Sequence, residues 1–494
     1  MGQELNDQEL VRRQKMRDLR ERGIDPFGHP FNRMDFSKDL VEKYANYDKE
    51  ALHEMHIPTS VAGRIMSKRS KGKTGFMHIQ DKFGQIQIYI RQDALSEDEF
   101  YLFDKGDIGD IVGIEGEVML TNTGEVTVKA LKYHHLSKAL RPLPEKFHGL
   151  QDREEARRHR YVDLIMNENS KRVAFMRPKI IRAIQKYMDN LGFVEVETSM
   201  LHPILGGANA KPFITHYNAL DSDFYLRIAT ELALKRLVVG GMESVYEIGR
   251  QFRNEGMDST HNPEFTTMEA YQAYSDMYGM MDLVENLFKE VALETIGTTD
   301  IEYQGVTIHL GGPYKRIHMV DAIKEVTGID FYKLNLDDAL KLAKEHEINP
   351  EKHEQTYGHI VNLFFEKYVE ETLIQPTIVF GHPIEISPLA KKSKDERFTE
   401  RFELFINRHE YGNAFSELND PIDQKERFEN QLKEKNLGNE EANEMDTDYI
   451  EALEYGLAPT GGIGIGIDRF VMLLCGVDSI RDVLLFPQMK KQNN

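Results

Sequence analysis

The sequence is poor in cysteine and tryptophan and has no long apolar run. Its 494 residues include one cysteine, Cys475, and no tryptophan. A single cysteine excludes an intramolecular disulfide and every zinc site that needs several cysteines. Because Cys475 lies in the apolar run 470–475, we expect a buried, unreactive thiol. The sequence also lacks both a membrane-spanning run and the apolar segment of a signal peptide, so we expect a soluble, cytoplasmic protein with no membrane partner.

Positive charge is scarce as well. The chain has 62 Lys and Arg against 82 Asp and Glu, which gives a formal net charge of −20. Such a chain does not suit a polycationic coat for nucleic acid, so a nucleic-acid partner would be held by a local basic patch. One such patch, residues 64–73, contains Arg64, Lys68, Arg69, Lys71 and Lys73 and no acidic residue. We interpret it as a nucleic-acid contact, with a solvated loop as the alternative.

The residue pattern changes twice along the chain and predicts three regions. Residues 1–56 mix charged residues with apolar residues near helical spacing, which predicts a helical segment. Residues 57–148 contain five short alternating segments separated by turn signals, which predicts an OB-fold β-barrel. Residues 149–494 mix long helical patterns with strands, and helices at about 330–375 have the position of an insertion. The predicted fold class is therefore α+β.

A predicted antiparallel hairpin at 245–271 carries an unusual set of side chains. It brings into one small region Arg253, Glu255, His261, Phe265 and Glu269. Strand alternation places Arg253 and Glu255 on one face, while Phe265, Glu269 and Tyr271 share a face of the returning strand. An arginine can hold a carboxylate and a phosphate together, and a phenylalanine face can stack on a purine. A surface hairpin with salt bridges would not explain this grouping.

Two further segments suit a phosphate-bearing ligand and a cationic one. The glycine-rich turn 461–466 allows close approach to the backbone, and Arg469 then begins a helix whose positive end favours phosphate. In a predicted strand at 410–417, alternate side chains project to one side. Glu410 and Glu417 are oxygen ligands suited to Mg²⁺ between phosphates. Together with Glu231 and Glu269 they predict a carboxylate-rich pocket for a substrate with a distal cation.

Taken together, these segments resemble the class II aminoacyl-tRNA synthetases, and most closely the bacterial type of lysyl-tRNA synthetase. Residues 175–200 look like motif 1, the dimerisation motif, and YEIGRQFRNEGMDSTHNPEFTTMEAY (246–271) looks like motif 2. GGIGIGIDR (461–469) looks like motif 3. FSELNDP (415–421) and GGANAKPF (206–213) point to the lysine-specific family. The resemblance covers nearly the whole chain and implies an OB-fold anticodon-binding domain followed by a class II catalytic domain, an antiparallel sheet flanked by helices.

The resemblance also implies an activity. The enzyme would activate lysine with ATP to lysyl-adenylate and transfer the lysyl group to the 3′ end of tRNA(Lys). ATP would be a substrate, accompanied by Mg²⁺, about two to three ions. The expected partners are tRNA(Lys), lysine, ATP and a second copy of the chain in a homodimer.

Site residues follow from the resemblance, position by position. The catalytic residues would be Arg253 and Arg469. Lysine would be bound by Gly207, Glu231, Arg253, Glu269, Tyr271, Asn413, Phe415 and Glu417. ATP would be bound by Arg253, Glu255, His261, Asn262, Phe265, Glu410, Gly466 and Arg469. Mg²⁺ would be held by Glu410 and Glu417, and the anticodon would be read by Arg64, Phe76 and Gln87.

Three other functions are weighed against this one. An aspartyl- or asparaginyl-tRNA synthetase shares the architecture but needs cationic side chains for its substrate, which the pair Glu269 and Glu417 disfavours. A ligase that lysylates a protein would lack the predicted barrel. A non-catalytic RNA-binding relative would not be expected to keep Arg253, Glu410 and Arg469.

Overall fold

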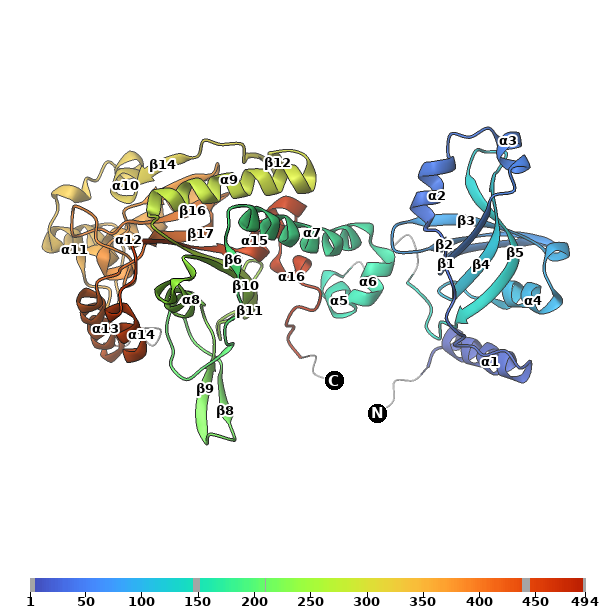
Figure 1. The fold of residues 1–494 in the computed structure, drawn as a ribbon, viewed down its shortest axis with the longest axis horizontal. Helices are drawn as coiled ribbons and strands as arrows, with labels where there is room; N and C mark the ends of the chain where they lie inside the picture. Colours follow the sequence, from blue (N-terminus) through green and yellow to red (C-terminus); the bar gives the residue numbers. More distant parts are fainter. Residues whose placement is uncertain (1–4, 145–151, 209, 438–444, 492–494) are drawn as a thin grey trace. The chain divides into compact units, whose positions relative to one another are not determined.

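The structure, a computed structural model, describes residues 5–144, 152–208, 210–437 and 445–491. The chain forms two compact units, Met1–Gly149 and Leu150–Asn494 (Figure 1). The predicted boundary between residues 148 and 149 lies outside the described residues.

Three helices open the first unit: α1 (Asp7–Glu21), α2 (Ser37–Tyr44) and α3 (Lys49–Glu54). A capping box formed by Asn6 and Glu9 starts α1, since each side chain accepts a hydrogen bond from the other residue's backbone N–H. Arg12 then ties α1 to the barrel by donating to the carbonyl oxygens of Ile108 and Ala139, both at 3.0 Å.

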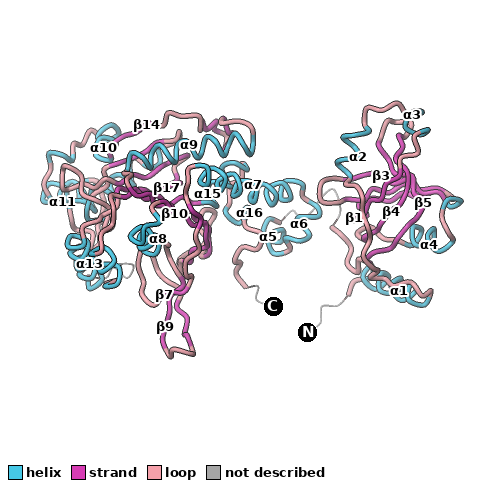
Figure 2. The backbone as a smooth tube through the Cα atoms, viewed as in Figure 1, coloured by secondary structure: helices cyan, strands magenta, loops and turns pink. Residues whose placement is uncertain are grey.

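The rest of the first unit is a closed five-stranded barrel in the order β1-β2-β3-β5-β4 (Figure 2). Its strands are β1 (Pro58–Lys71), β2 (Thr74–Gln80), β3 (Gln85–Arg91), β4 (Ile111–Leu120) and β5 (Val126–Ser137), and α4 (Glu97–Lys105) lies between β3 and β4. Alternate side chains fill the interior; Ile65, Ile88 and Ile114 are completely buried. The predicted OB-fold barrel is confirmed.

An eight-stranded sheet forms the centre of the second unit, in the order β14-β15-β16-β17-β18-β11-β10-β6. Its strands are β6 (Val194–Glu195), β10 (Ser244–Phe252), β11 (Glu264–Ala273), β14 (Lys315–His318), β15 (Thr377–Phe380), β16 (Arg401–Ile406), β17 (His409–Ser416) and β18 (Thr460–Gly466). The pairs are antiparallel except β6–β10 and β14–β15.

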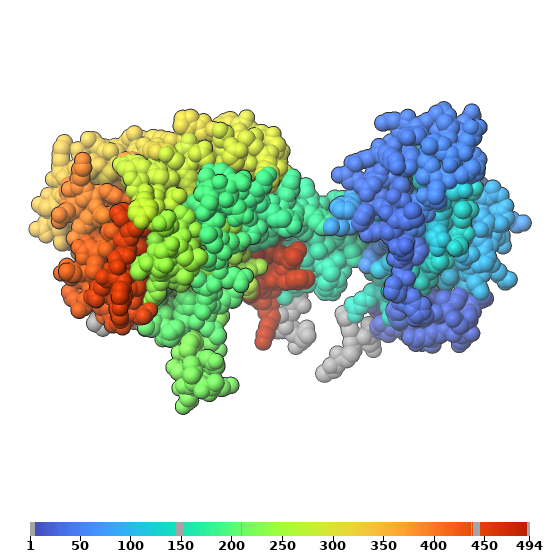
Figure 3. Space-filling view, in the orientation of Figure 1, coloured from blue at the N-terminus to red at the C-terminus, as the bar shows by residue number. Residues whose placement is uncertain are grey.

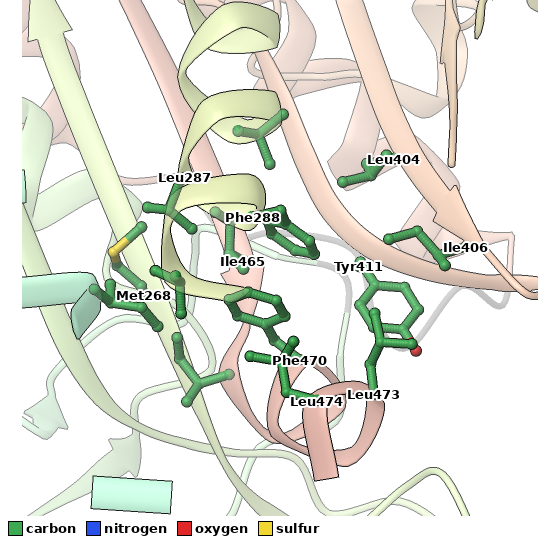
Figure 4. Packing of buried hydrophobic residues seen from close by; sticks show 14 of the residues in the cluster. Met268, Leu287, Phe288, Leu404, Ile406, Tyr411, Ile465, Phe470, Leu473 and Leu474 are labelled. Atoms are coloured by element: carbon green, nitrogen blue, oxygen red, sulfur yellow. The ribbon is translucent and has the colours of Figure 1, made fainter. Parts of the chain in front are cut away.

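Four helices contribute to the main hydrophobic core of this sheet: α7 (Glu168–Asn190), α9 (Met277–Ile296), α15 (Ile467–Cys475) and α16 (Ile480–Val483). Figure 4 shows the centre of this core, where the rings of Phe288 and Phe470 stack with centroids 4.0 Å apart. Cys475 is buried in it, and burial raises the pKa of its thiol to about 11. The predicted antiparallel sheet flanked by helices is confirmed.

Smaller elements surround the sheet. The helices are α5 (Arg153–Arg158), α6 (Arg160–Met166), α8 (Glu231–Leu237), α10 (Met319–Thr327), α11 (Leu336–Glu345), α12 (Tyr357–Tyr368), α13 (Pro421–Asn436), α14 (Thr447–Glu454) and α16 (Ile480–Val483). The strands are β7 (Leu201–His202), β8 (Ile214–Tyr217), β9 (Ser222–Leu226), β12 (Asp300–Tyr303) and β13 (Val306–His309). Helices α10, α11 and α12 lie between β14 and β15 in the sequence and share a second core with strands β14, β15 and β16. The β8–β9 hairpin stands out from the surface of the second unit (Figure 3).

Local structure differs from the sequence prediction in three places. Strand β10 ends at Phe252, so Arg253 and Glu255 lie in the following loop and not on a strand face. The ladder stops there because Pro263, opposite Arg253, has no N–H to donate. The alternation of Val194, Val196 and Thr198 predicts a strand after the helix, but β6 has only two residues and the Thr198 hydroxyl beyond it donates to Glu247. The glycine-rich segment is strand β18, not a turn.

Among the described residues, no helix combines the length and the apolar character that a membrane crossing requires.

Candidate active site

A cavity of about 490 Å³ lies in the second unit, at the loop between β10 and β11, strands β11, β17 and β18, and the first turn of α15. Most residues predicted to bind lysine or ATP line it. They are Gly207, Glu231, Arg253, Glu255, His261, Asn262, Phe265, Glu269, Tyr271, Glu410, Asn413, Phe415, Gly466 and Arg469. Glu417, predicted to contact both lysine and a metal ion, is not among the lining residues.

A buried ion pair supports the β10–β11 hairpin that carries this site. The guanidinium of Arg227 pairs with Glu247 of β10 at 2.5 Å and donates to the carbonyl oxygen of Arg250 at 2.9 Å. Glu247 also accepts a hydrogen bond from the hydroxyl of Thr198 at 2.7 Å. Both charged side chains are almost completely buried, so removing either one would leave the other without its partner in the interior.

The backbone of Arg253 is fixed at the start of the loop, but part of its guanidinium is not hydrogen-bonded. Its backbone N–H donates to the carbonyl oxygen of Pro263 at 2.9 Å. Its guanidinium carbon lies 5.2 Å from the centre of the Phe265 ring. The Nε of Arg253 is buried and has no hydrogen-bond partner among the described residues. A buried donor without a partner is costly, so this atom is suited to a ligand oxygen.

The rest of the loop is ordered by Asp258. Its carboxylate accepts from the backbone N–H groups of Thr260 and His261, each at 2.7 Å, and contacts Nδ1 of His261 at 2.8 Å. Desolvation opposes the change, but these hydrogen bonds lower the pKa of Asp258. The contact fixes the His261 ring, whose Nε2 lies 3.3 Å from Arg469. Asn262 donates to Gln488 at 2.7 Å.

Arg469 is positioned by contacts that join three distant segments. It donates to the carbonyl oxygen of Glu410 at 2.6 Å. Its neighbour Asp468 pairs with Arg177 of α7 at 2.5 Å and accepts from the backbone N–H of Thr266 in β11 at 2.6 Å. The segments predicted as motifs 1, 2 and 3 therefore meet at one carboxylate.

Two of the predicted lysine ligands share an internal cation that the sequence analysis missed. Lys235 of α8 pairs with Glu231 at 2.5 Å and also with Glu417. All three side chains are buried. Burial alone would lower the pKa of Lys235, but the charges of Glu231 and Glu417 raise it well above the ordinary value, so this side chain is a cation. Glu417, predicted as a metal ligand, thus has Lys235 as a partner within the protein.

Glu269 is a buried carboxylate of a different kind. It accepts hydrogen bonds from the backbone N–H of Thr230 at 3.0 Å and from the hydroxyl of Tyr271 at 3.2 Å, but forms no ion pair with any described residue. Burial is the main cause that raises its pKa. Gly462 leaves the room for this arrangement, since a Cβ there would collide with Glu417 and lie 2.5 Å from the Tyr271 ring.

Strand β16 contributes two lining residues that were not predicted, Arg401 and Glu403. Arg401 donates to Glu403 at 2.6 Å, to the side-chain oxygen of Asn413 at 3.0 Å and to the hydroxyl of Ser387 at 3.1 Å. Their spacing of two residues places both side chains on one face of the strand. The alternation of Arg401 and Glu403 is a strand signal in the sequence, close to the predicted strand at 410–417.

Glu403 and Glu410 are two carboxylates of this cavity that could hold a metal ion. Burial is the main cause that raises the pKa of Glu410, and the charge of Glu403 adds to it. Two adjacent carboxylates suit Mg²⁺, which commonly takes one or two protein carboxylates and completes its shell with phosphate oxygens and water. No group of three or more His, Cys, Asp or Glu suited to a metal ion occurs in the described parts of the chain.

In the barrel, two of the three predicted anticodon contacts lie on adjacent strands. Phe76 of β2 is exposed and its ring lies 4.9 Å from that of Tyr89 on β3, so the two rings offer a stacking surface. Gln87, also on β3, donates to Glu125 at 2.8 Å. In the register of β2 and β3, Phe76 lies opposite Tyr89 and Gln87 lies opposite His78.

The basic segment 64–73 is less free than its sequence indicates. Arg64 donates to the carbonyl oxygen of Gly109 at 2.8 Å, and burial lowers its pKa. Lys68 donates to the carbonyl oxygens of Asp104 and Gly106, and burial lowers its pKa to about 8. The exposed cations of this segment are Arg69, Lys71 and Lys73.

Comparison with known families covers both units. The family described as "tRNA synthetases class II (D, K and N)" matches residues 152–490, and the "OB-fold nucleic acid binding domain" matches residues 59–136. A protein named lysine–tRNA ligase from Lactococcus lactis subsp. cremoris is 61% identical over 490 residues, which are 99% of each chain. Proteins of the same name from Streptococcus pneumoniae and Staphylococcus epidermidis are 59% and 58% identical over at least 99% of each chain.

The family expected from the sequence motifs is thus confirmed over nearly the full length. The alternative of an aspartyl- or asparaginyl-specific relative is not favoured. The chain belongs to the class II tRNA synthetases, in the D, K and N group, and within that group to the lysine–tRNA ligase family.

Proposed function

We propose that the chain activates lysine with ATP and transfers the lysyl group to the 3′ end of tRNA(Lys). The observation that carries the proposal is Glu269, a buried carboxylate without an ion pair among the described residues, in the same cavity as Arg253 and Arg469. A buried charge needs a counter-charge, and the side-chain ammonium of lysine supplies one. The full-length similarity to proteins named lysine–tRNA ligase supports the same substrate.

The first step joins lysine to the nucleotide. A carboxylate oxygen of lysine attacks the α-phosphate of ATP in line, a new C–O–P linkage forms, and the bond to pyrophosphate breaks. The attacking carboxylate is already ionised at neutral pH, with a pKa of about 3.5, so no general base is needed. Arg253 holds this carboxylate and the α-phosphate together, and Arg469 offsets the charge on the phosphates.

The second step transfers the lysyl group. A hydroxyl of the terminal ribose of the tRNA attacks the carbonyl carbon of lysyl-adenylate, AMP leaves with the electron pair of the broken C–O bond, and the hydroxyl proton passes to the departing phosphate. Because AMP is a good leaving group, no covalent enzyme intermediate is required. Arg253 positions the reacting groups in both steps.

The nucleotide and the amino acid contact different walls of the cavity. ATP would be bound by Glu255, His261, Asn262, Phe265, Glu410, Gly466 and Arg469, with adenine between Phe265 and Arg469. The α-ammonium of lysine would be bound by Gly207 and Glu231, and its carboxylate by Arg253 and Asn413. The side-chain ammonium would be bound by Glu269 and Tyr271, with Phe415 along the aliphatic chain. Glu417 is paired with Lys235 beside this pocket, so its charge acts on the substrate without lining the cavity.

Mg²⁺ would be held by Glu403 and Glu410 together with phosphate oxygens of ATP. When bound there, the metal neutralises phosphate charge as it develops on the leaving pyrophosphate. Glu403 is fixed for this by Arg401, which donates to it at 2.6 Å. This proposal replaces the predicted pair of Glu410 and Glu417, since Glu417 already shares Lys235 with Glu231.

The anticodon of tRNA would be read on the barrel, where Phe76 would stack on one base and Gln87 would form a hydrogen bond to a base. Arg64 donates to the carbonyl oxygen of Gly109, so it would stabilise the structure of this surface. A homodimer is proposed from the likeness of residues 175–200 to motif 1. Exposed apolar side chains in and near this region support an interface: Val194, Met200, Leu201, Ile214 and Leu220.

Charging of unfractionated tRNA with radiolabelled amino acids, in the presence of ATP and Mg²⁺, tests this proposal. We expect acid-precipitable label with lysine. Label with aspartate or asparagine would keep the fold and discard the pocket. No label with any amino acid would favour a non-catalytic RNA-binding relative.

A further inference from the structure

Lys235 is a cation enclosed within the second unit. It lies four residues after Glu231 on α8, so the two side chains share one face of the helix. The same Nζ contacts Glu417, which follows β17 and is fixed by its backbone N–H donating to the carbonyl oxygen of Thr460 at 2.8 Å. The Lys235 side chain has no exposed surface.

Aromatic rings complete the surroundings of this ammonium group. Its nitrogen lies 5.4 Å from the ring centre of Phe415, 5.9 Å from that of Tyr449 and 6.0 Å from that of Tyr271. Two of these rings, those of Phe415 and Tyr271, line the cavity. Lys235 is thus separated from the cavity by residues proposed to contact the substrate, and it cannot itself be a surface salt-bridge partner.

The charges around the substrate pocket balance only when Lys235 is counted. The pocket has three buried carboxylates, Glu231, Glu269 and Glu417, and one enclosed ammonium group. Their net charge is −2, from three negative charges and one positive charge. Free lysine brings two ammonium groups and one carboxylate, and Arg253 is proposed to pair with that carboxylate, so the occupied pocket has four carboxylates and four cationic groups.

From this balance we infer that Lys235 is a positioning residue for the amino-acid substrate. Its ammonium group neutralises one carboxylate charge and pairs with both Glu231 and Glu417. Glu231 is the carboxylate proposed to bind the α-ammonium group, and Glu417 lies next to the site of the side-chain ammonium group. The two ammonium subsites are thereby held at a fixed separation. This inference rests on the proposed function, because it assumes that lysine is the amino acid that fills the pocket.

The first test is Lys235→Met, which keeps an unbranched apolar chain against the three rings and removes the charge. Lysine-dependent ATP–pyrophosphate exchange should lose about 100-fold or more in kcat/KM for lysine, because two buried carboxylates lose their shared partner. The loss should be in the KM for lysine, with the KM for ATP within about threefold of wild type. A folded variant with the wild-type KM for lysine would overturn the inference.

The second test separates positioning by charge from a merely structural role. Lys235→Ala removes three carbons and the ammonium group, which propylammonium can replace. Added propylammonium should restore exchange at least about tenfold, while 1-propanol of similar size should not. A folded Lys235→Ala protein that neither compound restores would overturn the inference.

A matched control and the wild type complete the design. Arg236, the next residue on α8, pairs with Asp446 at 2.8 Å and Asp448 at 2.9 Å and does not line the cavity, so Arg236→Met should show no response to propylammonium. Wild-type exchange with lysine is measured first. If it is absent, the proposed function fails, whereas normal wild-type exchange with an unaffected Lys235→Met contradicts only the role of Lys235.

Discussion

Replacing Glu269 with glutamine should remove lysine recognition while leaving the nucleotide site intact. The carboxylate is buried, accepts hydrogen bonds from Thr230 and Tyr271, and has no ion pair among the described residues. Glutamine has the same shape, and its side-chain oxygen can still accept the bond from Thr230. The substitution therefore removes a charge with little change in packing, so its effect reports on the missing counter-charge.

The magnitude follows from the burial of this group. An ion pair at about 4 Å and an effective dielectric of about 20 is worth roughly 4 kcal/mol, which is an upper value for a pocket still open to solvent. Removing one partner of a buried, hydrogen-bonded charge pair costs about 2–5 kcal/mol. Between about 2 kcal/mol and the upper value of about 4 kcal/mol, at 1.4 kcal/mol for each factor of ten, we expect Glu269→Gln to lower kcat/KM for lysine by roughly 30- to 700-fold in ATP–pyrophosphate exchange.

The pH dependence of the same assay gives an independent check. Burial raises the pKa of Glu269, with the charge of Glu231 acting in the same direction, and only the ionised form pairs with an ammonium group. As pH falls through this raised pKa, Glu269 is protonated and lysine binding weakens. The profile of kcat/KM should therefore decline on the acid side above the ordinary glutamate pKa of about 4.3. In Glu269→Gln the part of the decline that belongs to Glu269 should be absent, while Glu231 and Glu417, whose pKa values burial also raises, still titrate.

Glu264→Gln is the matched control. Glu264 lies on the same strand, β11, but pairs with Arg250 at 3.5 Å and does not line the cavity. Its substitution should change kcat/KM for lysine by less than about threefold. Equal losses in the two variants would mean that the strand, and not the charge of Glu269, governs activity. An unchanged kcat/KM in Glu269→Gln would refute the assignment of the ammonium pocket.

Three further substitutions test other parts of the site. Arg253→Ala should reduce exchange by about 100-fold or more, since it removes the group that holds both reacting partners; near-normal exchange would remove it from the mechanism. Gly462→Ala places a Cβ against Glu417 and should raise the KM for lysine at least about tenfold. Gly464→Ala is the control and should raise this KM far less, because the nearest atom to its Cβ would be 3.7 Å away. Equal effects of the two variants would contradict the steric reasoning. Arg227→Met breaks a buried ion pair and should lower the free energy of unfolding by about 3–5 kcal/mol in denaturant titrations; a change below about 1 kcal/mol would show that the pair does not support the hairpin.

Much of the fold was predictable because local pattern and tertiary position agree. In the barrel, apolar residues alternate with polar ones, and strands such as Gln85–Arg91 follow that period closely. The hairpin of motif 2 and the helix that follows the glycine-rich segment were also evident, since their signals lie within a few residues of each other. Strand ends were less predictable, and β10 is shorter than expected because Pro263 cannot extend the ladder.

Several site residues could not be predicted from the sequence, because their roles depend on contacts between segments that are far apart in the chain. Glu231 and Lys235 have the spacing of an ordinary surface ion pair on a helix, and nothing local indicates that Glu417 joins them in the interior. Arg401 and Glu403 lie on a strand adjacent to β17, but that pairing was not evident from the sequence. Arg64 reads as a free cation, although a carbonyl oxygen 45 residues away holds it.

Amino-acid-dependent ATP–pyrophosphate exchange, measured with Mg²⁺ across all twenty amino acids, tests most directly whether this cavity is a lysine-activating site. A substrate with a second ammonium group is needed to balance the buried carboxylates, and an uncharged side chain would leave one of them without a partner. We expect exchange with lysine and none above background with the other nineteen. Exchange with aspartate or asparagine, or with no amino acid at all, would contradict the assignment of the pocket.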